Sequence, residues 1–174
     1  MRKHTILAVW LATVIGLVCA ATAGPAPADT GGDEMAVANE LNQLRSRLGL
    51  PALAIKGELF DLARAWSGQQ AAVGAASHNP RLSQQLPSNW IRSGENVASG
   101  QEVWTMFDAL LASPGHALLM LDPGFNSVGI GIVQTGNGTY YATMVFLTTA
   151  PPARAAAPRQ PPCRRVRQGR CVLR

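Results

Sequence analysis

The apolar residues of this chain change their spacing part-way along it, and this change constrains the fold more than any other feature. Helical spacing comes first. A first helix is expected to end near Gly49, and its buried face has apolar residues four, three and four apart: Val37, Leu41, Leu44 and Leu48. A second helix is expected from about Glu58 to Val73, with a buried face formed by Leu59, Leu62, Ala63, Trp66 and Val73. The N-terminal half is therefore predicted to supply helices that cover a core.

The C-terminal part of the domain has strand-like composition instead. Residues 127–134 are rich in valine, isoleucine and glycine, and residues 139–148 are rich in tyrosine, threonine, valine and phenylalanine. Gly136-Asn137-Gly138 separates the two runs and is typical of a hairpin turn. Helices followed by an antiparallel hairpin predict an α+β fold in which the helices pack on a sheet.

Shorter elements are expected between these two parts. Residues 75–92 show no regular apolar spacing and are predicted to form a loop, whereas a helix is expected from Val103 to Leu111. Ser113-Pro114 is typical of a helix N-cap followed by proline, and this short helix is expected to run to about Leu121. Ser113 is therefore predicted to cap a helix. The alternative is a nucleophile paired with His116, because residues three apart on a helix share a face.

The N-terminus has the pattern of a secretory signal peptide. A basic start, Arg2-Lys3-His4, precedes an uncharged apolar run, and Ala21-Thr22-Ala23 is a small-x-small cleavage site. An uncleaved membrane anchor and acylation at Cys19 are the alternatives. The expected organisation is a signal peptide over residues 1–23, a flexible linker over 24–34, one folded domain over 35–149 and a tail over 150–174.

Charge is divided between the domain and the tail. Residues 24–150 hold ten acidic and six basic residues, a net charge of −4, whereas residues 151–174 hold seven arginines and no acid. The formal charge of +5 for the whole chain therefore describes an appendage and not the domain surface. An acidic domain disfavours nucleic-acid binding.

The basic tail cannot bury a core, because it consists largely of alanine, proline and arginine. It is predicted to be disordered, and a functional alternative is attachment to an anionic cell-envelope polymer or lipid surface. Cys163 and Cys171 would be the two cysteines left after signal cleavage, and a disulfide between them would suit an oxidising compartment. The domain is therefore expected to depend on apolar burial rather than on disulfides.

Two histidines and a carboxylate lie in glycine-, proline- or serine-marked stretches of the domain. Their contexts are Ser77-His78-Asn79-Pro80, Gly94-Glu95-Asn96 and Ser113-Pro114-Gly115-His116. These side-chain types serve both as zinc ligands and as general acid–base groups. The alternative for each is an ordinary hydrogen-bonding role, which is common for a lone loop histidine. His78, Glu95 and His116 are therefore candidate site residues that the fold must bring together.

Several short motifs occur in the order found in one known family. They are Leu41-Asn42-Gln43-Leu44-Arg45, Ser77-His78-Asn79, Gly94-Glu95-Asn96-Val97-Ala98, Ser113-Pro114-Gly115-His116 and Phe125-Asn126-Ser127-Val128-Gly129-Ile130-Gly131. From about Ala36 to Leu147 the chain resembles the CAP domain, also called the SCP domain, of cysteine-rich secretory proteins, insect antigen 5 and plant pathogenesis-related proteins. It is most similar to the bacterial members. The resemblance implies a three-layer α-β-α sandwich with an antiparallel sheet.

The resemblance also implies a central cleft lined by two histidines and two acidic residues, which bind zinc or another divalent metal in some members. His78, Glu95 and His116 match three of these four positions, and Asn79, Asn96 and Ser113 are expected to line the cleft. Ser113 stands where the second acid is expected, as it often does in bacterial members. The usual Gly-His-Arg-x-Asn stretch is Gly115-His116-Ala117-Leu118-Leu119 here, which favours an apolar ligand.

These implications predict a secreted binding module whose cleft holds a divalent metal, a small apolar or lipid-like ligand, or both. Three protein ligands would leave one zinc position open to water. The alternative is a metal-dependent hydrolase of ester or peptide bonds with Glu95 as the base, and no other catalytic residue is assigned. Binding is preferred, because a metal-bound Glu95 would not be free to act as a base and a fold does not transfer chemistry. A structural envelope protein with a vestigial cleft is a third alternative.

Overall fold

The computed structural model describes residues 30–150 and the backbone of residues 166–167 and 170–171. Its helices are α1 (Gly31–Arg47), α2 (Gly57–Val73), α3 (Leu82–Gln85), α4 (Val103–Ala112) and α5 (Pro114–Leu121). Its strands are β1 (Ala54–Ile55), β2 (Trp90–Gly100), β3 (Ser127–Gln134), β4 (Tyr140–Thr149), β5 (Val166–Arg167) and β6 (Arg170–Cys171). The predicted signal peptide, most of the predicted linker and Cys163 lie outside the described residues.

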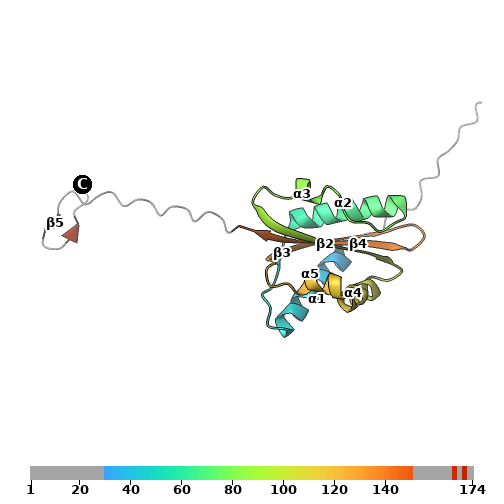
Figure 1. The fold of residues 1–174 in the computed structure, drawn as a ribbon, viewed down its shortest axis with the longest axis horizontal. Helices are drawn as coiled ribbons and strands as arrows, with labels where there is room; N and C mark the ends of the chain where they lie inside the picture. The colour runs from blue at the N-terminus through green and yellow to red at the C-terminus, as the bar shows by residue number, and fades with distance from the viewer. Residues whose placement is uncertain (1–29, 151–165, 168–169, 172–174) are drawn as a thin grey trace, which may run out of the picture.

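The domain has three layers, with a sheet between two layers of helices (Figure 1). The strand order is β1-β3-β4-β2, so β2 lies at one edge of the sheet. Helices α2 and α3 cover one face, and α1, α4 and α5 cover the other. This arrangement confirms the predicted α-β-α sandwich. The sheet is not wholly antiparallel, because the short β1 pairs in parallel with β3, whereas β4 is antiparallel to both β2 and β3.

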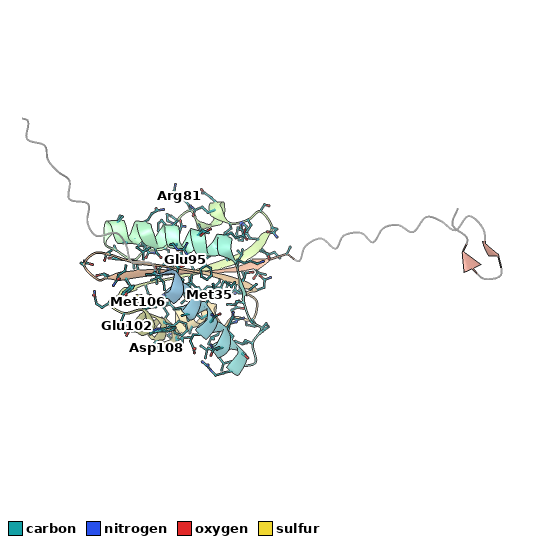
Figure 2. All side chains as sticks on the ribbon, turned by 180° about the vertical axis from the view of Figure 1, so that it is seen from behind. Met35, Arg81, Glu95, Glu102, Met106 and Asp108 are labelled. Atoms are coloured by element: carbon teal, nitrogen blue, oxygen red, sulfur yellow. The ribbon has the colours of Figure 1, made fainter. Side chains whose placement is uncertain are left out.

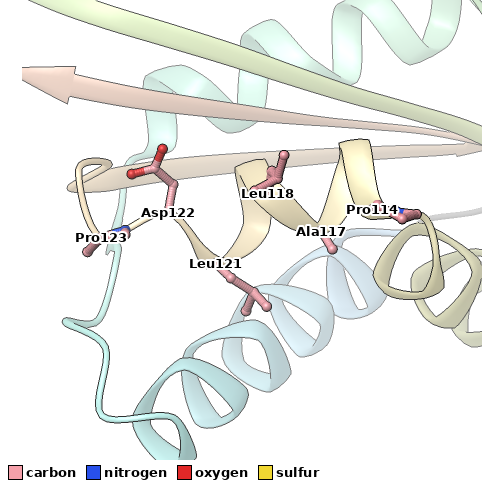
Figure 3. A pocket seen from close by; sticks show the side chains of 6 residues that line it. All are labelled: Pro114, Ala117, Leu118, Leu121, Asp122 and Pro123. Atoms are coloured by element: carbon pink, nitrogen blue, oxygen red, sulfur yellow. The ribbon is translucent and has the colours of Figure 1, made fainter.

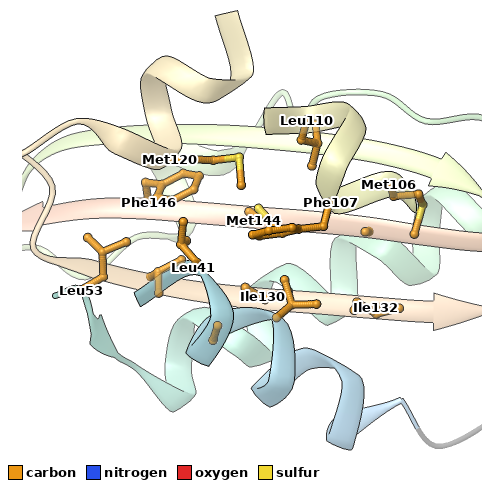
Figure 4. Close-up of a cluster of buried hydrophobic side chains, with 14 of the residues drawn as sticks. Leu41, Leu53, Met106, Phe107, Leu110, Met120, Ile130, Ile132, Met144 and Phe146 are labelled. Carbon is orange, nitrogen blue, oxygen red and sulfur yellow. The ribbon is translucent and has the colours of Figure 1, made fainter. Parts of the chain in front are cut away.

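Apolar side chains are buried on both faces of the sheet. The larger cluster lies between the sheet and the layer of α1, α4 and α5 (Figure 4), and its members include Leu41, Phe107, Leu110, Met120, Ile130, Met144 and Phe146. The smaller cluster lies under α2 and consists of Leu59, Ala63, Leu86, Val145 and Leu147. The alternation of β4 side chains feeds both clusters, because successive residues of a strand point to opposite faces. No disulfide is needed to explain this core.

Helix α2 packs unusually close to β3 because β3 carries two glycines. A Cβ atom added to Gly131 would lie 2.0 Å from the Arg64 nitrogen, and one added to Gly129 would lie 2.2 Å from the Leu59 carbonyl carbon. Both neighbours are backbone atoms of α2 and cannot rotate away. The two glycines therefore set the distance between helix and sheet.

The first helix begins earlier than expected. Residues up to 34 were predicted to be linker, but α1 starts at Gly31 and Glu34 is fully buried. Glu34 accepts hydrogen bonds from the Arg64 guanidinium and, at 2.9 Å, from the backbone nitrogen of Ile132. These bonds join α1 to α2 and β3. The start of α1 is difficult to predict from the sequence, because it is glycine-rich and is held in place by the Glu34 carboxylate rather than by apolar residues at helical spacing.

The helix faces also differ from the apolar pattern at their ends. Leu48 is 54% exposed and Val73 is 74% exposed, although both were predicted to be buried. Polar side chains are buried instead: Arg45 on α1, and Ser67 and Gln70 on α2. The other predicted helices and the hairpin agree with the structure within one residue at each end. The exception is residues 75–92, which contain the short α3 and the start of β2.

The described part of the tail forms a small antiparallel pair, in which Val166 of β5 lies opposite Cys171 of β6. Pairing between Cys163 and Cys171 stays a prediction. Among the described residues, no helix combines the length and apolar character needed to cross a bilayer.

Candidate functional site

The edge strand β2 carries the centre of the site. Glu95 and Asn96 are consecutive on this strand, so their side chains point to opposite faces of the sheet. Glu95 lies opposite Val145, which belongs to the cluster under α2, whereas Asn96 lies opposite Met144 in the cluster on the other face. Figure 2 shows Glu95 at the level of the sheet, and Glu102 and Met106 on the α4 side. Each helical layer therefore meets its own polar residue at this edge.

Glu95 holds the loop that carries His78. Its Oε1 lies 2.8 Å from His78 Nδ1 and accepts a 2.8 Å hydrogen bond from the backbone nitrogen of Asn79. The Glu95 side chain is 5% exposed and that of His78 is 64% exposed, so a buried carboxylate anchors an imidazole at the surface. The other oxygen, Oε2, is buried and has no partner among residues 30–150. It is an acceptor that a hydrogen-bond donor would satisfy.

Helix α2 fixes the same loop one residue earlier. The Trp66 indole donates a 2.7 Å hydrogen bond to the Ser77 carbonyl, and Gln70 Oε1 accepts a 3.2 Å bond from the Ser77 backbone nitrogen. Gln70 Nε2 lies 2.8 Å from the hydroxyl of Thr143, a buried β4 residue. Both backbone groups of Ser77 are thus held by buried or half-buried side chains, which places His78 reproducibly.

Asn96 holds the segment that carries His116 on the other face of the sheet. It is fully buried, and its Nδ2 donates a 3.0 Å hydrogen bond to the carbonyl of His116, in the first turn of α5. Asn79 and Asn96 were expected to line the cleft. Both are buried and support the two histidine segments instead, since the Asn79 side chain bonds to Gln85 and to the backbone of Arg81.

Ser113 and His116 form a second hydrogen-bonded pair. Ser113 Oγ lies 2.8 Å from His116 Nδ1. Ser113 occupies the N-cap position of α5, as predicted, but its side chain makes no cap hydrogen bond. The predicted capping role of this hydroxyl is therefore wrong, because the hydroxyl forms a hydrogen bond with the imidazole three residues later instead of with the helix backbone.

A pocket of about 270 Å³ opens beside this pair, between β2 and α4. We call it the β2–α4 pocket. It is lined by Ala98, Ser99, Gly100, Gln101, Glu102, Thr105, Met106, Ala109, Leu110, Ser113 and His116. Its size is close to the lower end of small-molecule sites, which span about 300–1,000 Å³. Apolar walls with a polar pair at one end are typical of sites that bind a small ligand.

Glu102 places a negative charge on the wall of this pocket. Hydrogen bonds from the Thr105 hydroxyl and from the backbone nitrogens of Thr105 and Trp104 lower the pKa of Glu102 below its ordinary value. The carboxylate therefore stays ionised at neutral pH and caps the N-terminus of α4. An anionic ligand head would be repelled at this end of the pocket.

A second, more open hollow lies on the surface of α5 (Figure 3). This α5 groove has a volume of about 390 Å³ and is lined by Pro114, Ala117, Leu118, Leu121, Asp122 and Pro123. None of the predicted site residues lines it, and the Arg92 guanidinium beside Asp122 lowers the pKa of that carboxyl. The groove therefore lacks the polar pair found in the β2–α4 pocket.

The sequence of this chain matches the model of a known protein family. The model of the cysteine-rich secretory protein family, CAP, matches residues 38–147. The chain belongs to the CAP family. Comparison with curated protein sequences gives no significant match.

Solved structures share the CAP fold with this chain. An outer surface protein of Borrelia burgdorferi is 20% identical with a TM-score of 0.67, and the match covers 71% of this chain and 98% of that one. An extracellular SCP-domain protein of Bacillus anthracis is 25% identical with a TM-score of 0.60, covering 67% of this chain and 40% of that one. A venom allergen-like protein of Schistosoma mansoni is 14% identical with a TM-score of 0.55, covering 68% and 89%. The bacterial neighbours thus include outer-surface and extracellular proteins.

The metal site implied by the CAP resemblance needs His78, Glu95 and His116 at one point. Among the described residues, no group of three or more His, Cys, Asp or Glu side chains is placed to hold a metal ion. His78 and Glu95 are in contact, and Glu95 Oε2 offers a free acceptor, but His116 bonds to Ser113 in the other helical layer. As placed, the residues do not fit a three-ligand centre. The metal site stays a prediction, as does the hydrolase that depends on it.

Sequence reasoning missed most of the pocket wall. Glu102 lies at the N-cap of α4, Thr105 and Ala109 lie on α4, and none of the three is assigned to the site from the sequence. One local signal was available, because a carboxylate directly before Val103 is suited to accept bonds from the first turn of a helix. The position of α4 against β2 is a tertiary property that no local pattern in the sequence indicates.

Proposed function

We propose that this CAP-family chain is a secreted, extracellular binding module that holds a small, neutral and largely apolar ligand in the β2–α4 pocket. The observation that carries the proposal is the Ser113–His116 pair at one end of an otherwise largely apolar pocket. The polar pair would orient a hydroxyl or carbonyl, while Met106, Ala109 and Leu110 would contact a hydrocarbon. The signal-like N-terminus and the extracellular Bacillus anthracis neighbour support secretion.

The two ends of α4 give the pocket two different polar groups. The ionised Glu102 carboxylate, which precedes α4, disfavours an anionic group at that end, whereas Ser113 and His116, which follow α4, suit a neutral alcohol or ester group. The volume of about 270 Å³ limits the ligand to a short or medium hydrocarbon chain. The β2–α4 pocket therefore supports binding of small neutral amphiphiles.

A series of straight-chain alcohols tests this proposal by calorimetry on the full chain. Each buried CH2 contributes about 0.8 kcal/mol, so the affinity should rise up to about fourfold per carbon and then level off when the pocket is full. Ala109→Trp should weaken binding by about tenfold or more, because the indole occupies the pocket. The matched control is Ala112→Trp, since Ala112 is exposed on the same helix and does not line the pocket.

The outcomes separate a built site from general apolar adhesion. Affinity that grows without limit with chain length, or that falls equally in both tryptophan variants, would contradict the proposal. Loss of binding in Ala109→Trp alone would support it.

A further inference from the structure

We propose that Ser113 and His116 are a nucleophile and its general base, and that the pair removes acyl groups from small neutral esters without a metal. The proposal rests on the β2–α4 pocket as the ligand site and adds a covalent step to it. It differs from the metal-dependent hydrolase predicted from the sequence, because neither His78 nor Glu95 takes part. The reacting group is a serine hydroxyl.

The geometry of the pair allows His116 to activate the serine in the tautomer whose Nδ1 accepts the hydroxyl proton. The 2.8 Å separation of Ser113 Oγ and His116 Nδ1 lies within the range for transfer of the hydroxyl proton to the imidazole. Proline at the first position of α5 has no backbone N–H, and the serine makes no cap hydrogen bond. The hydroxyl is therefore committed to the imidazole rather than to the helix backbone. Both residues line the same pocket.

The backbone of His116 is also held in place by the edge strand β2. Its carbonyl accepts the hydrogen bond from Asn96, whose side chain is completely buried. Asn96 Oδ1 is buried and has no partner among the described residues, so this amide is fixed through its nitrogen alone. Asn96 is a positioning residue in this scheme. It holds the first turn of α5 against the edge strand and thereby fixes the base relative to the nucleophile.

The same turn supplies donors for a developing negative charge. Helix geometry leaves the first backbone N–H groups of α5 without acceptors inside the helix. The N–H groups of Gly115 and His116 belong to this turn, and neither bonds to a loop or side-chain acceptor among residues 30–150. Backbone donors beside a serine nucleophile stabilise the oxyanion of an acyl-transfer intermediate.

The reaction balances with an ester and water alone. Ser113 Oγ attacks the ester carbonyl carbon while His116 Nδ1 accepts the hydroxyl proton, and the carbonyl oxygen becomes an oxyanion. The C–O bond to the alcohol then breaks, and His116 returns the proton to the departing alkoxide. Water, deprotonated by His116, attacks the acyl-serine and releases a carboxylic acid, which regenerates the serine.

The test uses an alkyl fluorophosphonate on the purified full chain, followed by peptide mass spectrometry. Serine attack on phosphorus expels fluoride and leaves a phosphonyl group on the oxygen. We expect labelling at Ser113, unaffected by a chelator. Labelling should be absent in Ser113→Ala and slower by about 10²-fold or more in His116→Gln, the range for loss of a general base. Ser46→Ala is the matched control, because Ser46 is exposed on α1 and does not line the pocket, and this variant should be labelled at Ser113 as the wild type is.

Hydrolysis of p-nitrophenyl esters gives the second measurement. Acetate and butyrate should be cleaved with a burst of p-nitrophenol equal to the protein concentration, and Ser113→Ala should remove the burst. The proposal is overturned if Ser113 is unlabelled, if His116→Gln labels at the wild-type rate, or if turnover persists in Ser113→Ala. Normal alcohol binding with an unreactive Ser113 would refute the reaction and leave the binding function standing. Labelling of Ser113 without alcohol binding would refute the binding function instead.

Discussion

Gln70 connects the buried interior of the domain to the loop that presents His78. Ser67 Oγ lies 2.9 Å from both the Gly131 carbonyl and the Thr143 hydroxyl. A serine has one proton to donate and a carbonyl only accepts, so Ser67 donates to Gly131 and accepts from Thr143. Thr143 therefore accepts from the Gln70 amide nitrogen, which directs Gln70 Oε1 toward Ser77. The chain of bonds fixes the orientation of one amide and, through it, the start of the histidine loop.

Replacing Gln70 should show this dependence as lost stability. Gln70→Met keeps the length of the side chain but leaves the Ser77 N–H without its acceptor and Thr143 without its donor. We expect the free energy of unfolding to fall by about 1–3 kcal/mol in urea titrations. Gln69→Met is the control, because Gln69 is exposed on the same helix, and it should change stability by less than about 0.5 kcal/mol. Equal effects in the two variants would contradict the bond chain.

The sequence indicates which residues belong to the site, but it does not indicate which of them contact one another. His78, Glu95, Ser113 and His116 stand out because of their local contexts and the family resemblance. Their pairing depends on the strand register, which sends Glu95 to one face and Asn96 to the other. Polar side chains such as Gln70 and Arg45 have no apolar periodicity, so their burial could not be predicted in the same way.

Helix α2 and strand β3 pack closely, because β3 carries glycines where it faces the helix backbone. Helix α2 carries the residues that hold the histidine loop, and its height above the sheet is set by the two β3 glycines. A change in this height would move Trp66 and Gln70 together, and the support of Ser77 with them. The spacing of α2 from the sheet is therefore coupled to the site.

Alanine substitutions at two glycines should change the free energy of unfolding in opposite directions. Gly131→Ala places a methyl group 2.0 Å from the backbone of α2, and we expect the free energy of unfolding to fall by about 3 kcal/mol or more. Gly68→Ala, inside α2, meets no atom within 4 Å and should raise stability by about 0.5–1 kcal/mol. Urea unfolding of both variants checks the prediction. Tolerance of Gly131→Ala would contradict the close packing described here.

The elements themselves follow from the sequence more closely than their packing does. Helices α2, α4 and α5 and the β3–β4 hairpin were predicted within one residue at each end, since apolar periodicity and turn residues mark them. Strand β1 was not predicted, because a two-residue strand has too short a pattern, and its parallel pairing with β3 is a tertiary feature. The start of α1 was missed because Glu34 is anchored by polar bonds.

For the whole molecule, the opposite charges of domain and tail suggest separate tasks. The domain has a net charge of −4, whereas the last 24 residues carry seven arginines and no acid. Each basic residue near an anionic surface contributes about 1 kcal/mol, an effect that salt screens. We propose that the tail attaches the chain to an anionic envelope surface while the pocket binds its ligand.

Deletion of residues 151–174 should remove this attachment. In sedimentation with vesicles that contain phosphatidylglycerol, the full chain should bind at low salt, and the truncated chain should bind about tenfold less or worse. A full-length variant with the seven arginines changed to glutamine controls for tail length and should behave like the truncation. Binding that survives both changes, or that ignores salt, would contradict the electrostatic attachment.

We place the ligand of this CAP domain in the β2–α4 pocket, beside Ser113 and His116. Amide NMR of the isotope-labelled full chain, titrated with n-octanol, tests this placement, because each residue with a backbone N–H reports separately. We expect the largest saturable shifts on Ser99, Thr105, Ala109 and His116. Shifts concentrated on Ala117, Leu118 and Leu121 of the α5 groove, or spread evenly without saturation, would contradict it.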